Sequence, residues 1–167
     1  MWYTGDEHDE YGHITEDPVM RRRMYEKRMA KLKLAEEEIP EGRRYAVYGS
    51  DSPKVLLVGW GFVKGAALKA LERLEGEGVR AAYFHIRMFL PFPKEALRKY
   101  VEEAEVAVAV EHSYSSQAAL LASMLAGVSI DRHILKYTGR PIYVGELVEG
   151  VRRVLKGESR VVLDYGH

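Results

Sequence analysis

From about residue 43 onward, short apolar runs alternate with longer stretches of helical periodicity, and this alternation constrains the fold more than any other feature. The runs ending at Val58 and Val110 are apolar almost throughout, which is expected of strands covered on both faces. Strands separated by helices of about ten residues require right-handed crossovers, and these favour a mainly parallel sheet. The pattern therefore predicts an α/β domain of three layers over residues 43–167, with helices on both faces of the sheet.

The individual elements follow from the same periodicity and from glycine and proline at the breaks. Strands are expected at residues 54–58, 79–86, 106–110 and 134–137. Residues 45–48 fit a short strand or an extended segment, and residues 160–163 fit an edge strand or a tail. Helices are expected at residues 63–75, 94–104 and 144–155, and another, capped by Ser115 or Ser116, should reach Leu125.

Residues 1–42 show a different pattern and form a predicted arm. Asp17 and Pro18 suit the N-cap and the first position of a helix, which should stop before Ile39-Pro40. One face of this helix carries an apolar stripe, and most of the remaining surface is basic. The stripe consists of Met20, Met24, Tyr25, Met29 and Leu32. A single helix cannot bury such a stripe by itself, so we expect it to dock on the domain or on a partner.

The composition excludes several classes of protein. The chain has no cysteine, so it can supply neither disulfides nor thiolate ligands for an iron–sulfur cluster or a zinc site. Its formal net charge is zero, and no apolar stretch approaches the roughly 20 residues of a membrane helix. No segment resembles a signal peptide, so we expect a cytoplasmic protein. Asparagine is absent and Gln117 is the only glutamine, which favours a thermophilic source.

Gly59, Gly61 and Gly65 follow a predicted strand and open a predicted helix, where a dinucleotide-binding fingerprint would lie. Their spacing is G-x-G-x-x-x-G rather than G-x-G-x-x-G. Trp60 and Phe62 also place bulk where a diphosphate needs close approach to the backbone. We therefore interpret the glycines as a tight turn that packs a helix on the sheet, with a nucleotide site as the alternative.

A second loop, which contains Glu111, His112 and Gln117, follows the strand that ends at Val110. In parallel sheets, this edge is where ligands bind. Adjacent residues of one extended segment point in different directions, so Glu111, His112 and Ser113 cannot easily form a catalytic triad. We expect the loop to be a packing and interface element, or else a contact for a small ligand. No catalytic, cofactor-binding or metal-binding residue is assigned.

The stretch from residue 4 to 17 is rich in acids and histidines. Its candidate residues for contact between domains or subunits are Glu7, His8, Asp9, Glu10, Gly12 and His13. His8 and His13 could hold a divalent ion, but their five-residue spacing places them on different sides of a helix, and Gly12 indicates a loop. Carboxylates this dense more often pair with basic side chains, either those of residues 21–23 or those of another subunit.

The basic face of the arm offers one further class of partner. Its lysines and arginines could bind the phosphates of a nucleic acid. Several glutamates dilute the positive charge, however, and no base-reading module accompanies it. We therefore prefer a solvated face and do not expect nucleic acid as a partner.

The acidic stretch, followed by Lys27-Arg28 and Lys31-Leu32, resembles the segment that leads into the C-terminal region of the α chain of 2-oxoacid:ferredoxin oxidoreductases. The rest of the chain resembles the transketolase C-terminal type of domain, which has a Rossmann-like fold. That likeness rests on four segments: Val58-Gly59-Trp60-Gly61, Arg87 to Pro93, Val110-Glu111 with Gln117, and Lys136 to Pro141. The resemblance covers nearly the whole chain in the right order.

The resemblance implies that the chain is the C-terminal portion of such an α subunit and serves scaffolding and subunit contact. The family's complete enzyme oxidatively decarboxylates a 2-oxoacid, forms an acyl-CoA and reduces ferredoxin. Its thiamine diphosphate, Mg²⁺, iron–sulfur clusters and CoA would be held elsewhere, because this chain lacks cysteines and a G-D-G motif. The chain should be inactive alone and join a homo- or hetero-oligomer with the other subunits. Two alternatives stay open: a free-standing small-molecule or nucleotide-binding α/β module, and a nucleic-acid-binding adaptor that uses the arm.

Overall fold

The computed structural model describes residues 5–164, and the chain divides into two compact units, residues 1–40 and residues 41–167. The first unit contains helix α1 (Pro18–Glu38). Asp17 is its N-cap, and the Asp17 carboxylate accepts hydrogen bonds from the backbone N–H groups of Val19 and Met20, both at 3.2 Å. Both ends of this helix agree with the prediction. The predicted domain boundary after residue 42 stays a prediction.

The apolar stripe of α1 is mostly exposed. Met24 is the buried residue of this helix, whereas Tyr25, Met29 and Leu32 are 48%, 50% and 41% exposed. Docking of this stripe on the domain or on a partner therefore stays a prediction.

The second unit is an α/β domain built from short elements. In chain order these are the 3₁₀ turn η1 (Glu41–Arg43), β1 (Tyr45–Gly49), β2 (Val55–Trp60), α2 (Val63–Gly76), β3 (Ala81–Ile86), α3 (Lys94–Glu103), β4 (Val106–Glu111), α4 (Gln117–Ala126), β5 (Arg132–Leu135), α5 (Val144–Leu155) and β6 (Arg160–Val162). The predicted alternation of strands and helices is confirmed.

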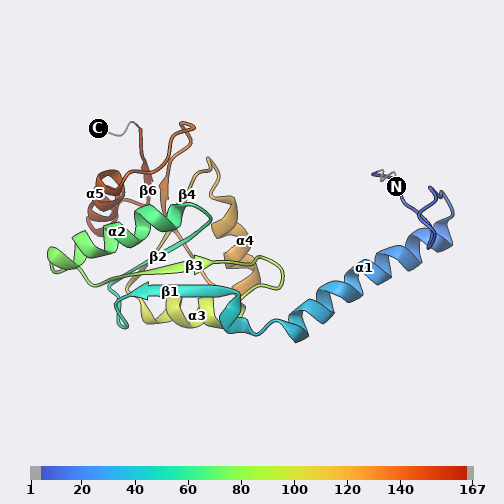
Figure 1. Ribbon diagram of the computed structural model, residues 1–167. Helices are drawn as coiled ribbons and strands as arrows, with labels where there is room; N and C mark the ends of the chain where they lie inside the picture. Colours follow the sequence, from blue (N-terminus) through green and yellow to red (C-terminus); the bar gives the residue numbers. More distant parts are fainter. Residues whose placement is uncertain (1–4, 165–167) are drawn as a thin grey trace. The chain divides into compact units, whose positions relative to one another are not determined.

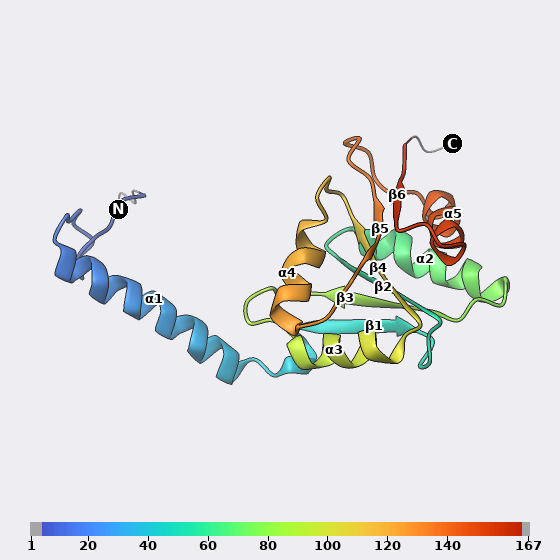
Figure 2. The same ribbon diagram turned by 180° about the vertical axis from the view of Figure 1, so that it is seen from behind.

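The strands form one sheet in the order β1-β3-β2-β4-β5-β6, and Figures 1 and 2 together label all six. Strands β2 to β6 pair in parallel, while β1 runs antiparallel to β3, with Tyr45 opposite Ile86. Residues 160–162 are an edge strand beside β5, so this segment is the predicted strand and not a tail. The strand predicted at residues 134–137 instead begins at Arg132 and ends at Leu135.

Helices cover both faces of the sheet (Figures 1 and 2). On one face, α2 and α5 pack over strand residues such as Leu57 and Tyr83. On the other face, α3 and α4 pack over Leu56 and Phe84. Neighbouring strand residues alternate between the two cores because successive side chains point to opposite faces of a sheet. The three-layer α/β fold is therefore confirmed. Within residues 5–164, no helix is both long enough and apolar enough to span a bilayer.

Candidate functional site

The strand order places a topological switch point between β2 and β4. Strand β2 has β3 on one side and β4 on the other, and the helices that follow β2 and β4 lie on opposite faces of the sheet. In open parallel sheets, ligands bind in the crevice outside such strand ends. A cavity of about 290 Å³ is found there, lined by residues 60–63, residues 111–113, Gln117 and Ala118. Two predicted loops that are distant in sequence therefore meet at one site.

The three predicted glycines play different parts at this site. Gly59 lies in β2, where a Cβ would come within 3.0 Å of the Val110 carbonyl oxygen and 3.2 Å of the Tyr83 hydroxyl. Gly61 forms the turn, and its φ of +60° is a conformation that residues with a side chain rarely adopt. Gly65 lies in the first turn of α2, with open space around it, and is not among the described residues that line the cavity. Packing and turn geometry thus account for Gly59 and Gly61.

Glu111 is almost fully buried, with 2% of its surface exposed. Its Oε1 accepts hydrogen bonds from the Ser116 hydroxyl at 3.0 Å and the Ala119 N–H at 2.8 Å. Its Oε2 accepts from the Ser113 hydroxyl at 3.2 Å and the Ala118 N–H at 3.0 Å. The carboxylate therefore caps α4 from the preceding strand and satisfies two of its free N–H groups. Since both oxygens are engaged, Glu111 is poorly placed to act as a general base.

Ser116 occupies the N-cap position of α4, as one of the two predicted caps, but its own side chain does not cap the helix. Its backbone is left-handed, with a φ of 54°. The Ser116 hydroxyl lies 3.0 Å from Glu111 and 2.9 Å from Nδ1 of His133, which was not singled out from the sequence. A hydroxyl that donates to a carboxylate can only accept from the imidazole, so His133 does not activate this serine.

His112 is half-buried beside the cavity, and its ring centre lies 4.4 Å from that of Phe62. Its Nε2 accepts a hydrogen bond from the Ile142 N–H at 3.2 Å, so the neutral ring carries its proton on Nδ1. Burial lowers the pKa of His112 below its ordinary value, and the charge of Lys136 lowers it further. The Ser113 hydroxyl donates to Glu111, so these three adjacent residues do not form a catalytic triad.

A second cavity, of about 390 Å³, adjoins the first, because Phe62 and His112 line both. Its other lining residues are 136–137 and 139–141. Lys136 is fully buried, and its Nζ lies 2.6 and 2.9 Å from the two carboxylate oxygens of Glu146. It also lies 4.9 Å from the centre of the Tyr143 ring. Sequence reasoning missed this ion pair, although a lone lysine that follows an apolar run was the available signal. A paired, buried lysine fixes the loop and is poorly suited to react.

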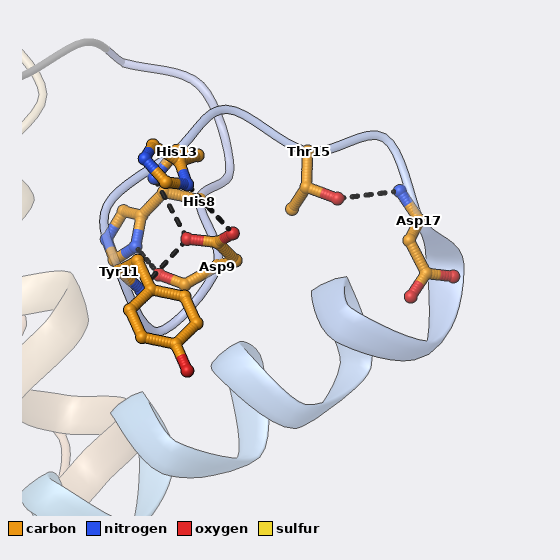
Figure 3. Close-up of polar contacts among 6 residues, drawn as sticks. All are labelled: His8, Asp9, Tyr11, His13, Thr15 and Asp17. Atoms are coloured by element: carbon orange, nitrogen blue, oxygen red, sulfur yellow. Dashed lines mark hydrogen bonds and ion pairs between the residues drawn. The ribbon is translucent and has the colours of Figure 1, made fainter.

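One aspartate orders the acidic loop of the arm, as Figure 3 shows. Asp9 Oδ1 accepts hydrogen bonds from the backbone N–H groups of Tyr11 and His13, both at 2.9 Å. The Asp9 N–H donates in turn to the His13 carbonyl at 2.8 Å. Gly12 turns the chain with a φ of +89°. The segment is therefore a short folded-back loop, as Gly12 indicated.

Both histidines of this loop lie against Asp9 (Figure 3). Nδ1 of His8 is 2.7 Å from the Asp9 carbonyl oxygen, and Nδ1 of His13 is 3.4 Å from Asp9 Oδ2. Across residues 5–164, no group of three or more His, Asp or Glu side chains is arranged to hold a metal ion. Glu10 and His13 are exposed and available for contact.

Glu7 forms a bidentate ion pair within the arm. The Arg28 guanidinium donates two hydrogen bonds to its carboxylate, at 3.0 and 2.6 Å, and the Glu7 side chain is 5% exposed. These bonds lower the pKa of Glu7 to about 2. The expected pairing of an acidic side chain with residues 21–23 is found with Arg28 instead. Arg21 contributes a longer-range charge and lies over the Tyr25 ring at 5.2 Å.

Comparison with known proteins gives consistent matches. Residues 53–147 match the family described as pyruvate:ferredoxin oxidoreductase core domain II. The 2-oxoacid:ferredoxin oxidoreductase 1, subunit alpha, of Aeropyrum pernix is 51% identical over 168 residues, which is 99% of this chain. The subunit alpha of a 2-oxoacid:ferredoxin oxidoreductase from Saccharolobus solfataricus is 47% identical over 165 residues, or 98% of this chain. The chain spans about a quarter of the length of these relatives, 26% in each case.

Solved structures give the same picture. The alpha chain of a probable 2-oxoacid ferredoxin oxidoreductase from Thermoplasma acidophilum is 31% identical, with a TM-score of 0.50, over 70% of this chain and 99% of that one. A 2-oxoglutarate:ferredoxin oxidoreductase from Magnetococcus marinus matches 90% of this chain and 26% of that one, with a TM-score of 0.66 and 21% identity. A split gene transketolase has a TM-score of 0.53 and 16% identity, over 66% of this chain and 41% of that one. The last two matches support the fold alone.

Proposed function

This chain belongs to the α subunits of the 2-oxoacid:ferredoxin oxidoreductases, and we propose that it is the scaffolding and subunit-contact portion of such an enzyme. The enzyme it would serve oxidatively decarboxylates a 2-oxoacid, transfers the acyl group to CoA and passes electrons to ferredoxin. Its partners would be the other subunits of that complex. The chain spans 26% of the relatives, so the proposed activity is that of the assembly.

The observation that carries this proposal is the 51% identity across 99% of the chain to an α subunit. The geometry of the crevice agrees with a contact role, because its buried carboxylate, its buried lysine and one nitrogen of its histidine are already engaged. Glu111 accepts four hydrogen bonds, Lys136 is paired with Glu146, and the Nε2 of His112 is bonded to the backbone. General acid–base and nucleophilic catalysis need a side chain that is free to reach a substrate, and these engaged groups are not placed for it.

The residues at the crevice do not fit the iron–sulfur clusters or the Mg²⁺ of such an enzyme. Iron–sulfur clusters need cysteine thiolates, which this sequence lacks. Mg²⁺ needs free oxygen ligands, whereas the oxygens of Glu111 and Glu146 are hydrogen-bonded or paired. We therefore assign the clusters and Mg²⁺ to other parts of the complex, and we propose the same for thiamine diphosphate, since this sequence lacks a G-D-G motif, and for CoA. The Magnetococcus marinus relative is itself described with 2-oxoglutarate and CoA bound.

Two surfaces would serve contact with other parts of the assembly. One is the acidic loop, where Glu10 and His13 are exposed. The other is the mouth of the crevice, where Trp60 and Phe62 are 48% and 70% exposed beside Gln117. Aromatic side chains exposed beside polar groups are typical of protein interfaces. The mouth of the crevice therefore fits an interface better than a small-molecule site.

The proposal is tested by purifying the tagged chain gently from its native host and identifying the proteins that accompany it. We expect a thiamine-binding subunit and an iron–sulfur subunit, and 2-oxoacid-dependent dye reduction by the recovered complex. The chain alone, supplied with thiamine diphosphate, Mg²⁺, CoA and a 2-oxoacid, should reduce no dye. Turnover by the isolated chain, or a chain that emerges without these subunits, would show the proposal to be wrong.

A further inference from the structure

Helix α4 has an inverted distribution of side chains. Its buried positions are all alanine, at residues 118, 119, 122 and 126, and the last three belong to the core between the sheet and α3. Apart from Gln117 at its start, its exposed positions carry large apolar side chains. These form what we call the α4 patch: Leu120 (57% exposed), Leu121 (40%), Met124 (81%) and Leu125 (37%). A helix that faces solvent shows the opposite pattern, with large apolar side chains inward and polar ones outward.

The α4 patch is continuous and uncharged. Leu120 and Met124 are four residues apart, as are Leu121 and Leu125, so each pair is stacked along one face of the helix. No residue of Gln117–Ala126 is charged. Leu90, which is 64% exposed, lies in the loop between β3 and α3, and this loop runs beside α4 in both ribbon views (Figures 1 and 2). A contiguous exposed apolar surface of this kind marks a site of protein contact.

The helix that carries the patch is held at both ends. At its start, the Glu111 carboxylate accepts from the N–H groups of Ala118 and Ala119. At its end, Gly127 adopts a φ of +67° and donates to the Ser123 carbonyl at 2.8 Å. Exposure of the patch is therefore a property of an ordered helix and does not result from fraying. A partner would meet a surface that is already organised, which lowers the entropy cost of binding.

We propose that the α4 patch docks this domain onto the remainder of the α subunit, the part of the polypeptide that the relatives have in addition to the matched stretch. This inference rests on the proposed function. The matched stretch is 26% of the relatives' length, so in them most of the polypeptide lies outside this domain. Interfaces within one permanent assembly are larger and more apolar than transient ones. An uncharged helix face of leucine and methionine fits such a surface and offers nothing to a charged partner.

The test measures binding of the purified chain to the purified remaining α-subunit polypeptide of the same source by calorimetry. Wild-type chain should bind, and Met124→Glu should weaken the affinity by at least about tenfold, because it places a charge inside an apolar interface. Met124 is 81% exposed, so this change leaves the core intact, and thermal melting should show an unchanged fold. Lys99→Glu, at an exposed position of α3 on the same side of the sheet, is the control and should bind like wild type. Leu120→Glu provides a second variant.

A second readout is oxidation of Met124 by dilute peroxide, which should be rapid in the free chain and much slower in the complex. Equal affinity of wild type and both patch variants would overturn the proposal. So would a dimer of the free chain that Met124→Glu dissociates while binding to the remainder is unchanged, because a second copy would then cover the patch. If other subunits accompany the chain from its host but the remainder does not bind it, the docking proposal is wrong and the proposed function stands. If no subunit accompanies it, the proposed function itself fails.

Discussion

Helices α4 and α5 follow neighbouring strands of one sheet, yet they distribute their side chains in opposite ways. Helix α5 buries residues such as Leu147 and Val151 and exposes Glu149 and Arg152, which form an ion pair at 3.0 Å. Helix α4 buries alanines and exposes the α4 patch. The apolar surface of α5 is satisfied within the chain, whereas the apolar surface of α4 is left for protein outside it. Helix α5 therefore completes the core of the domain, whereas α4 offers a surface for contact with other protein.

The N-termini of the two helices also differ, in the element that supplies the carboxylate at the helix start. Glu146 belongs to α5, where it accepts a hydrogen bond from the Tyr143 N–H at 2.9 Å and pairs with Lys136. Glu111 belongs to the strand before α4 and reaches across the loop to that helix. Carboxylates stabilise the free N–H groups at a helix start in both cases. In α4, however, the carboxylate comes from β4, so it also fixes to the sheet the helix that exposes its apolar side chains.

The largest effect is expected when the anchor of α5 is broken. Glu146→Gln removes the countercharge of the fully buried Lys136 but keeps an acceptor for the Tyr143 N–H. An unpaired buried charge costs about 3–5 kcal/mol, and the free energy of unfolding in urea should fall by that amount. Adding Lys136→Met should recover most of the loss. A cost below about 1 kcal/mol would mean that the pair behaves like a surface ion pair.

The two helix faces can be compared directly with one substitution on each. Leu147→Ala removes a fully buried side chain from the core under α5 and should lower the free energy of unfolding by about 2–5 kcal/mol. Leu120→Ala, on the exposed face of α4, should change it by no more than about 0.5 kcal/mol in the isolated chain. Chemical denaturation of both variants measures the difference. Equal losses would contradict the contrast between the helices.

Breaking the attachment of α4 to the sheet should lower the free energy of unfolding by less than breaking the anchor of α5, but by a measurable amount. Glu111→Gln turns one carboxylate oxygen into an NH₂ group that faces donors, so the N–H of Ala118 or Ala119 loses its acceptor. Leaving a buried donor unsatisfied costs about 1–3 kcal/mol. Hydrogen exchange should show the loss concentrated in the first turn of α4. Ser113→Ala, which removes a single donor to the same carboxylate, is the control and should have a smaller effect.

A smaller effect should appear on acidification, because the histidine between the two helix starts resists protonation. Burial and the charge of Lys136 hold the pKa of His112 below its ordinary value of 6.5. Below that value the unfolded chain binds a proton that the folded chain refuses, so stability is full above pH 6.5 and falls as the pH drops through this window. His85 and His133 have lowered pKa values too, and add to this trend. His112→Gln should reduce the loss between about pH 7 and pH 5 in urea titrations, and an unchanged slope would contradict this role.

The sequence pattern predicts the arrangement of α5, but it does not predict which face of α4 is buried. The bounds of α5 agree with the predicted residues 144–155, because its charged and apolar positions have a single helical phase. In α4 the alanines and the larger apolar residues both occur at helical spacing, so periodicity alone cannot say which set faces the sheet. The choice depends on how closely the helix must approach the strands, which is a property of the assembled fold.

Other features depended on pairings that no local pattern encodes. The parallel sheet followed from the alternation of elements, but the antiparallel direction of β1 is set by its partner β3. The crevice loops were predicted at the right edge of the sheet, yet the burial of Glu111 required the start of α4 to fold back onto β4. The acidic side chains were expected to pair with residues 21–23 or with another subunit, whereas the path of the acidic loop brings Glu7 to Arg28.

The strand order also has a consequence for how the sheet can be assembled. Strand β2 lies inside the sheet, and β3 pairs on one side of it while β4 pairs on the other. Strands β5 and β6 then follow outward in chain order beyond β4, and β1 closes the opposite edge beside β3. Each strand therefore joins an open edge, and none has to be inserted between two strands that are already paired. A chain emerging from the ribosome could extend this sheet with nearly every strand as it is synthesised, and only β1 has to wait for its partner.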